Sequence, residues 1–308
     1  KASTTLWGYF FKAVERLTDE KIRRAADRMA AEAVPLSAAG GTPESGPEWQ
    51  ARSRRLLGRA AMERLGRARV LVCGLGGVGS FCAEALVRSG VGELTLAEFD
   101  QVADSNRNRQ LPALTSTLGQ DKLEVCARRF LDINPDLRLN RIACRLTPDR
   151  LPALLEGEPF DYIADAIDDL PAKTRLLSLA RSRNIPVITS MGAGFRLDPA
   201  KLLITDIKKT HTCPLARRLR RALKEEGIAE GIEAVWSTEL PLEPKEAGEG
   251  PASMIFVPAS AGLLMASHII RRLTEEKGRE DKGGSGTNAA NGLEAEVNRT
   301  RGEDENDG

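Results

Sequence analysis

The sequence has no excess of one charge, no long apolar run and no internal repeat, and each absence excludes a class of protein. Lysine and arginine number 45 and aspartate and glutamate 44, which gives a net charge of +1. No global field therefore attracts nucleic acid, and any such affinity needs a local basic patch. No apolar stretch approaches the ~18 residues that a membrane-spanning helix needs.

Paired cysteines are also missing, because the five cysteines form no C-x-x-C motif. They are Cys73, Cys82, Cys126, Cys144 and Cys213. Three of them lie in apolar periodic segments, which predicts reduced thiols in the core of an intracellular, cytoplasmic protein. The chain begins with Lys1, so the lack of a targeting signal says nothing about the compartment.

Composition divides the chain into three parts. Residues 1–46 combine a charged, Ala-rich helical pattern with a Pro/Gly/Ser-rich linker, and we expect an N-terminal extension there. Residues 277–308 carry almost no large apolar side chains, which predicts a disordered tail. The remaining stretch, 47–276, has the size of one domain.

Within 47–276, short apolar runs alternate with amphipathic stretches. Strands are predicted over 69–74, 93–100, 137–146, 160–168 and 185–194, and helices over 78–90, 118–135, 171–184 and 214–226. This alternation is typical of right-handed βαβ crossovers. It predicts an α/β fold of the Rossmann-like, doubly wound type, with a mostly parallel sheet and helices on both faces. Ligands of such sheets bind at the carboxyl ends of the strands.

The stretch CGLGGVGSF, residues 73–81, contains a G-x-G-x-x-G turn formed by Gly74, Gly76 and Gly79. It follows a predicted strand and opens a predicted helix, as a phosphate-binding turn does. Asp100 stands 21 residues beyond Gly79, a spacing that suits a carboxylate bound to ribose hydroxyls. On these residues alone, NAD and other nucleotides remain open alternatives.

Polar residues further along the chain favour a triphosphate. They are Asn108, Arg109, Lys122, Asp165 and Asp168. The β and γ phosphates require fixed cations, and Mg²⁺ requires a carboxylate with waters around it, whereas a dinucleotide needs neither. Structural alternatives stay open: Asp168 would cap the helix that begins near Pro171, and Lys122 would be a solvated helix residue.

From about Arg52 to Arg272, through RVLVCGLGGVGSF, SNRNRQL, LGQDK and DAIDDLPAKTRLL, the chain resembles the ThiF/MoeB and ubiquitin-activating adenylation family. The resemblance implies that the protein binds ATP and Mg²⁺ and activates a carboxylate as an acyl-adenylate. The implied nucleotide-binding residues are Gly74, Gly76, Gly77, Gly79, Asp100, Asn108, Arg109, Lys122 and Asp165. The implied catalytic residues are Arg109, Lys122 and Asp168, with Asp168 as the Mg²⁺ ligand.

Within that family, the stretches RLDPAK, DIKKT, PLARRLR and WSTE are similar to the branch that cyclises N6-threonylcarbamoyladenosine in tRNA. ThiF and MoeB close a zinc site with two C-x-x-C pairs, so we expect no structural zinc here. The resemblance implies that the partners are the modified tRNA, a second copy of the chain and a cysteine desulfurase system. In this family the arginine at the position of Arg109 is commonly supplied across the dimer interface. An anchored N-terminal segment would instead place the protein at the mitochondrial outer membrane.

Two other functions stay open. One is the activation of a ubiquitin-like or sulfur-carrier protein, for which Cys213, beside His211 and near Lys208 and Lys209, would be a thioester cysteine. The other is a non-catalytic scaffold that binds a nucleotide. His268 lies in an apolar helical stretch, where we expect a packed side chain and not a ligand.

A basic helix is predicted over 214–226, with an apolar stripe of Leu215, Leu219 and Leu223. Its cationic residues are Arg217, Arg218, Arg220, Arg221 and Lys224. Since the net charge of the chain is close to zero, this local concentration of arginine favours contacts with tRNA phosphates. The alternative is a solvated surface helix.

Overall fold

The structure, a computed structural model, describes residues 46–157, 159–247 and 250–275. The chain divides between Ala51 and Arg52, and the fold presented here is that of the unit that begins at Arg52. Nearly all of the predicted N-terminal extension and the whole predicted tail lie outside the described residues.

One seven-stranded sheet forms the centre of the described part, in the order β3-β2-β1-β4-β5-β7-β6. Its strands are β1 (Arg69–Cys73), β2 (Glu93–Ala97), β3 (Arg138–Ile142), β4 (Tyr162–Asp165), β5 (Val187–Ser190), β6 (Leu202–Asp206) and β7 (Glu233–Ser237). Every neighbouring pair is parallel except β6 and β7. Val70 of β1 pairs with Leu94 on one side and with Tyr162 on the other. The chain therefore builds outward from β1 in both directions, and the crevice between β1 and β4 is the expected place for a ligand.

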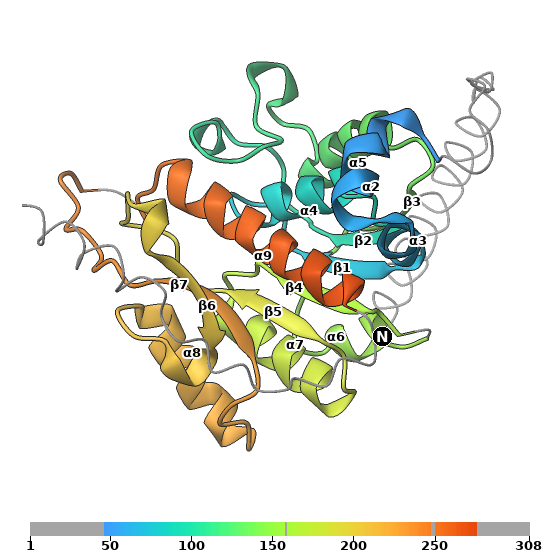
Figure 1. Cartoon of the computed structure of the whole chain (residues 1–308). Helices are drawn as coiled ribbons and strands as arrows, with labels where there is room; N and C mark the ends of the chain where they lie inside the picture. The colour runs from blue at the N-terminus through green and yellow to red at the C-terminus, as the bar shows by residue number, and fades with distance from the viewer. Residues whose placement is uncertain (1–45, 158, 248–249, 276–308) are drawn as a thin grey trace, which may run out of the picture. The chain divides into compact units, whose positions relative to one another are not determined.

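Helices cover both faces of the sheet (Figure 1). The described helices are α2 (Ala51–Leu57), α3 (Arg59–Arg67), α4 (Gly79–Arg88), α5 (Lys122–Ile133), α6 (Leu151–Leu154), α7 (Leu170–Ser182), α8 (Pro214–Glu225) and α9 (Phe256–Thr274), of which α2 buries no residue. Short 3-10 turns of this unit are η2 (Asp104–Asn106), η3 (Thr115–Thr117), η4 (Pro199–Lys201) and η5 (Ile207–Lys209), and η1 (Glu48–Gln50) belongs to the first unit. The doubly wound α/β fold is confirmed.

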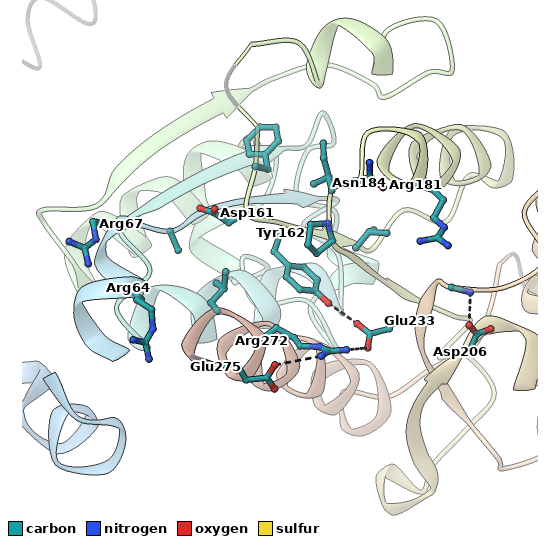
Figure 2. Close-up of a pocket in the computed structure, with 17 residues that line it drawn as sticks. Arg64, Arg67, Asp161, Tyr162, Arg181, Asn184, Asp206, Glu233, Arg272 and Glu275 are labelled. Atoms are coloured by element: carbon teal, nitrogen blue, oxygen red, sulfur yellow. Dashed lines mark hydrogen bonds and ion pairs between the residues drawn. The ribbon is translucent and has the colours of Figure 1, made fainter. Parts of the chain in front are cut away.

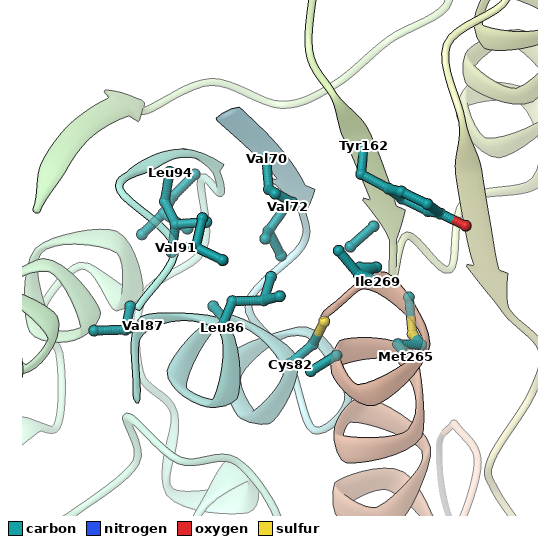
Figure 3. Packing of buried hydrophobic residues seen from close by; sticks show 14 of the residues in the cluster. Val70, Val72, Cys82, Leu86, Val87, Val91, Leu94, Tyr162, Met265 and Ile269 are labelled. Atoms are coloured by element: carbon teal, nitrogen blue, oxygen red, sulfur yellow. The ribbon is translucent and has the colours of Figure 1, made fainter. Parts of the chain in front are cut away.

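The central strand β1 shows how the sheet forms two cores. Val70 and Val72 pack into one core with residues of α4, α5 and α9, part of which Figure 3 shows. Leu71 and Cys73 point to the other face, into a core with residues of α6, α7 and α8. A parallel strand buried on both faces reads as a continuous apolar run, which is why RVLVC is recognisable in the sequence.

The predicted elements differ from the structure at their ends and at one edge. The helix expected from residue 118 begins at Lys122, because Gly119 has a φ of 76° and Asp121 is extended. The strands β6 and β7 were not predicted. The edge strand β6 is only partly buried and runs antiparallel to β7, so it does not follow the βαβ alternation of the other strands.

Candidate active site

The glycine turn between β1 and α4 leaves room only for glycine at two of its positions. Gly74 has a φ of 87°, and a Cβ there would lie 2.9 Å from the carbonyl oxygen of Ala166. A Cβ on Gly79 would lie 1.8 Å from the carbonyl oxygen of Gly74. At Gly76, by contrast, the nearest neighbour of an added Cβ is Gln110 Nε2 at 3.9 Å. The turn is therefore packed tightly against other backbone at Gly74 and Gly79, whereas the half-buried Gly76 makes only an ordinary van der Waals contact. Such a turn can bring its backbone N–H groups close to a phosphate.

Glu98, which the sequence did not single out, fixes this turn. Glu98 is 7% exposed and directly follows the last residue of β2. It accepts hydrogen bonds from the backbone N–H of Leu75 at 2.7 Å, of Phe99 at 2.7 Å and of Asp100 at 2.9 Å. One side chain thus ties the glycine turn to the start of the loop that carries Asp100. The only sequence signal was its place two residues before the predicted ribose carboxylate.

Asp100 and Lys122 meet at this edge. Lys122 begins α5, is 4% exposed, and its Nζ lies 2.9 Å from Asp100 Oδ2, while the Asp100 side chain is 48% exposed. A buried ammonium paired with a half-exposed carboxylate excludes the alternative of a solvated lysine. The structure brings together the residues predicted for the ribose and for the phosphates.

The loop from Ser105 to Gln110 lies over the glycine turn. Arg109 is half-buried; its Nη1 donates to the carbonyl oxygen of Ser105 at 2.8 Å and to Asn108 Oδ1 at 2.9 Å. A Cβ on Gly77 would lie 3.5 Å from Arg109 Cγ, which places this arginine beside the turn. Gln110 Oε1 is buried without a hydrogen-bond partner in the described part of the chain. An unsatisfied buried acceptor in a native structure calls for an explanation, and a donor supplied by a ligand is one.

The two predicted carboxylates after β4 differ in their surroundings. Asp165 is fully buried and paired with Lys173 at 2.7 Å, so the structure places it behind the site and not at an open surface. Asp168 is exposed and forms no hydrogen bond or ion pair with another described residue. The helix α7 is capped by Asp169, whose side chain accepts from the backbone N–H of Ala172 at 2.9 Å. The alternative that Asp168 caps this helix is therefore wrong.

The basic helix α8 is present as predicted and begins near the same edge of the sheet. A Cβ on Gly192, just after β5, would lie 3.5 Å from the sulfur of Cys213, the N-cap of α8. Of the predicted cations, Arg217, Arg218, Arg221 and Lys224 are exposed, and Arg221 forms a surface ion pair with Glu225 of the same helix at 3.3 Å. Arg220 is not free, because its Nη1 donates to the carbonyl oxygen of Thr210 at 2.7 Å. It fastens α8 to the preceding turn.

Four of the five cysteines are buried and none is in a disulfide. Burial raises the pKa of the Cys82 and Cys126 thiols to about 12. Burial also raises the pKa of Cys73 well above its ordinary value, and the Asp165 carboxylate adds to the effect. Cys213 is 5% exposed, and its sulfur accepts from the backbone N–H of Ala216 at 3.5 Å.

A cavity of about 1510 Å³ lies at the opposite edge of the sheet, where β4, β5 and β7 begin. None of the predicted nucleotide-binding residues lines it. Figure 2 shows Tyr162 and Arg272 converging on Glu233 there. Glu233 also bonds His268 Nε2 at 2.6 Å. His268 is thus a packed side chain in an ion-pair cluster, as expected.

A glycine turn between β1 and α4, a carboxylate after β2 and a buried lysine at the start of the next helix define a nucleotide-binding α/β protein of the Rossmann type. The ThiF family model matches residues 50–307. The chain belongs to the ThiF family.

Individual relatives agree with this assignment. The chain is 38% identical over 240 residues to the tRNA threonylcarbamoyladenosine dehydratase of Bacillus subtilis, covering 73% of this chain and 94% of the relative. It is 35% identical over 251 residues to the Escherichia coli enzyme of the same name, covering 73% and 93%. The crystal structure of that E. coli enzyme in complex with ATP matches with a TM-score of 0.70 and 35% identity, covering 74% of this chain and 96% of the other. The predicted family is confirmed.

Proposed function

We propose that this protein uses ATP to cyclise N6-threonylcarbamoyladenosine in tRNA, through an acyl-adenylate of the threonyl carboxylate. The observation that carries the proposal is the buried Lys122 ammonium beside Asp100 at the glycine turn. A dinucleotide site needs the ribose carboxylate but no buried cation, whereas a triphosphate site needs both. The names of the relatives at 35–38% identity supply the substrate.

The site fits ATP. Only Gln110 Nε2, at 3.9 Å, would lie within 4 Å of a Cβ on Gly76, and this amide nitrogen is a donor that could bond a phosphate oxygen. Asp100 would bind the ribose, and Lys122, Arg109 and Asn108 would bind the phosphates. Asp168 would hold Mg²⁺, which in proteins is usually bound by one or two carboxylates together with substrate phosphates and waters. When bound, the ion supplies charge neutralisation for the departing pyrophosphate.

The reaction needs no nucleophile from the protein. An oxygen of the threonyl carboxylate attacks the α-phosphorus of ATP and pyrophosphate leaves, which converts the carboxylate into a mixed anhydride with AMP. The neighbouring carbamoyl group then attacks the acyl carbon, the bond between that carbon and AMP breaks, and the carbamoyl group releases a proton to solvent, so the ring closes with net loss of water. Because both groups belong to one nucleoside, intramolecular geometry supplies a large effective concentration. The protein has to hold the reactants and stabilise the charge that develops on the phosphates.

The activation of a ubiquitin-like or sulfur-carrier protein through a thioester at Cys213 receives less support. That side chain is buried, and its sulfur caps α8. Nearby Lys208 forms an ion pair with Glu230. These contacts indicate a structural cysteine, whereas a reactive one requires exposure and free cations beside it.

We also propose that α8 binds the tRNA, that the protein acts as a homodimer, and that it works in the cytoplasm. Exposed arginines on a helix that begins near the carboxyl edge of the sheet would reach phosphates of a substrate whose base lies at that edge. None of the described helices has the length and apolar character required to cross a bilayer. The five free thiols support a reducing compartment.

The test is AMP formation with tRNA that carries threonylcarbamoyladenosine, compared with the same tRNA lacking the modification. We expect AMP and a cyclised nucleoside, detected by mass spectrometry, with the modified tRNA and not with the unmodified one. In a thermal shift assay, ATP with Mg²⁺ should stabilise the protein and NAD should not. Tight NAD binding, or AMP release that is indifferent to the modification, would overturn the proposal.

A further inference from the structure

A fully buried ion pair lies directly behind the turn that carries Asp168. Lys173 of α7 and Asp165 of β4 are both 0% exposed, and Lys173 Nζ lies 2.7 Å from Asp165 Oδ2. Thr189 of β5 joins them, since its hydroxyl donates to Asp165 Oδ2 at 2.7 Å and accepts from Lys173 Nζ at 2.9 Å. A helix and two strands therefore meet in one polar network inside the second core.

The other carboxylate oxygen of Asp165 reaches forward into the turn. Asp165 Oδ1 accepts from the backbone N–H of Ile167 at 3.1 Å, and the N–H of Ala166 donates to the carbonyl oxygen of Cys73 at 2.9 Å. This turn also packs on the glycine turn, because a Cβ on Gly79 would lie 3.1 Å from Ala166 Cβ. The network thus fixes the path of the backbone between β4 and the exposed Asp168.

Stability does not explain the network. Taking two charges out of water is costly, and well-packed apolar side chains of similar volume often stabilise a protein as much or more. A conformational requirement is one reason for a protein to keep a buried lysine at such a position. The requirement visible here is the turn that leads to Asp168, one residue beyond Ile167.

We propose that Lys173 is a positioning residue of the reaction: through Asp165 and Thr189 it holds the 165–169 turn so that Asp168 is placed to bind Mg²⁺. The proposal rests on the proposed function, because that function assigns the ion to Asp168. Lys173 touches neither nucleotide nor metal in this scheme. Its effect passes through two buried side chains and the backbone of the turn.

The test removes the whole network at once, so that no buried charge is left unpaired. The triple variant D165L/K173M/T189V is compared with D168N and with wild type by calorimetry of ATP binding, with and without Mg²⁺. We expect the variant to fold with a wild-type Tm and to bind metal-free ATP normally. The gain in ATP affinity that Mg²⁺ confers should shrink to the level seen in D168N. AMP formation should fall by about 10- to 100-fold, as misplacement of a group by about 1 Å does.

A double-mutant cycle decides whether the effect passes through Asp168. If it does, adding D168N to the triple variant should not reduce the gain in ATP affinity from Mg²⁺ any further, because the effects of coupled changes are not additive. Additive losses, or a folded triple variant with the full Mg²⁺ effect, would overturn the proposal. A D168N variant that keeps the full Mg²⁺ effect would instead remove the metal role of Asp168 and overturn both proposals.

If the triple variant does not fold, T189V replaces it, with T95V of the buried β2 threonine as the matched control. T189V must then weaken the Mg²⁺ effect and T95V must not, and equal behaviour of the two counts against the proposal.

Discussion

Lys122 and Asp100 neutralise each other at the carboxyl edge of the sheet, with Nζ and Oδ2 2.9 Å apart. The lysine is almost completely buried, whereas the carboxylate is half-exposed. A bound nucleotide would use both groups, the first for phosphate and the second for ribose. The pair therefore keeps the lysine extended toward the site before ATP arrives, and it satisfies a buried ammonium that would otherwise lack a partner.

Substitution of the two residues should separate binding from chemistry. D100A removes contacts to the ribose that persist throughout the reaction, so the affinity for ATP should fall and turnover at saturating ATP should change less. Because D100A also leaves the buried Lys122 without its partner, the Tm of the variant is measured alongside. K122M removes a cation that faces developing charge, so turnover should fall more than affinity. Calorimetry and steady-state AMP formation measure the two effects. D104A, which removes a carboxylate from a surface ion pair with Arg107, is the control that should change neither.

Arg109 should matter chiefly for turnover. The R109A variant loses a guanidinium beside the glycine turn that would face charge growing on pyrophosphate, and we expect a loss of roughly a hundredfold or more in AMP formation. R107A, two residues away and paired with Asp104 on the surface, is the matched control. Normal turnover in R109A would contradict the adenylation proposal and favour a dinucleotide as the ligand of the glycine turn.

Mixing of inactive variants tests whether Arg109 acts across a dimer interface. If it does, an R109A protomer and a D168N protomer together form one intact site, and activity should recover to a fraction of wild type. If Arg109 serves its own site, the mixture should stay as inactive as its components. Sedimentation of each variant alone gives the oligomeric state that this comparison requires.

The exposed arginines of α8 should contribute to tRNA affinity through charge. Replacing Arg217, Arg218 and Arg221 with serine should weaken binding and reduce the slope of log affinity against log salt by up to about 0.7–0.9 for each phosphate that the helix no longer neutralises. ATP affinity should stay the same. The control triple R59S/R88S/R141S removes arginines from surface ion pairs elsewhere and should leave tRNA binding unchanged. Unaltered tRNA affinity in the α8 variant would make that helix a solvated surface.

Glu233 should make the protein sensitive to acid. Burial raises the pKa of this carboxyl, but hydrogen bonds from His268, Tyr162 and Arg272 outweigh it and lower the pKa from 4.5 to about 2. A depressed pKa contributes stability above the unfolded value, and that contribution is lost as the pH falls from about 4.5 through about 2. E233Q should therefore have a lower Tm than wild type at pH 7, and the difference should vanish near pH 2. A difference that is the same at both pH values would show that charge plays no part.

Local patterns predicted most of the fold. The doubly wound sheet was predictable because strands such as β1 are buried on both faces and read as unbroken apolar runs. The antiparallel β6 was not, since its partial burial breaks that run and its pairing with β7 spans the whole of α8. The glycine turn and Asp100 were found from their spacing, and Lys122 from its residue type and the family resemblance. Their nucleotide contacts remain predictions.

The roles of Glu98 and Lys173 could not be read from the sequence, because each depends on partners that only the fold brings near. Glu98 binds backbone N–H groups on both sides of it in the chain, and Lys173 binds residues of two strands. Asp165 looked like a ligand because it ends a strand at the right edge. In the structure, Lys173 and Thr189 both donate hydrogen bonds to its carboxylate.

The C-terminal helix α9 completes a core that the N-terminal half begins. Met265 and Ile269 pack with Val72 and Leu86, which lie far earlier in the chain. During synthesis the apolar faces of β1 and α4 consequently stay uncovered until nearly the whole domain has left the ribosome. Closure by so distant a segment slows folding and prolongs exposure to aggregation. Yield in the cell should thus depend on how quickly α9 finds its place, a selective pressure separate from catalysis.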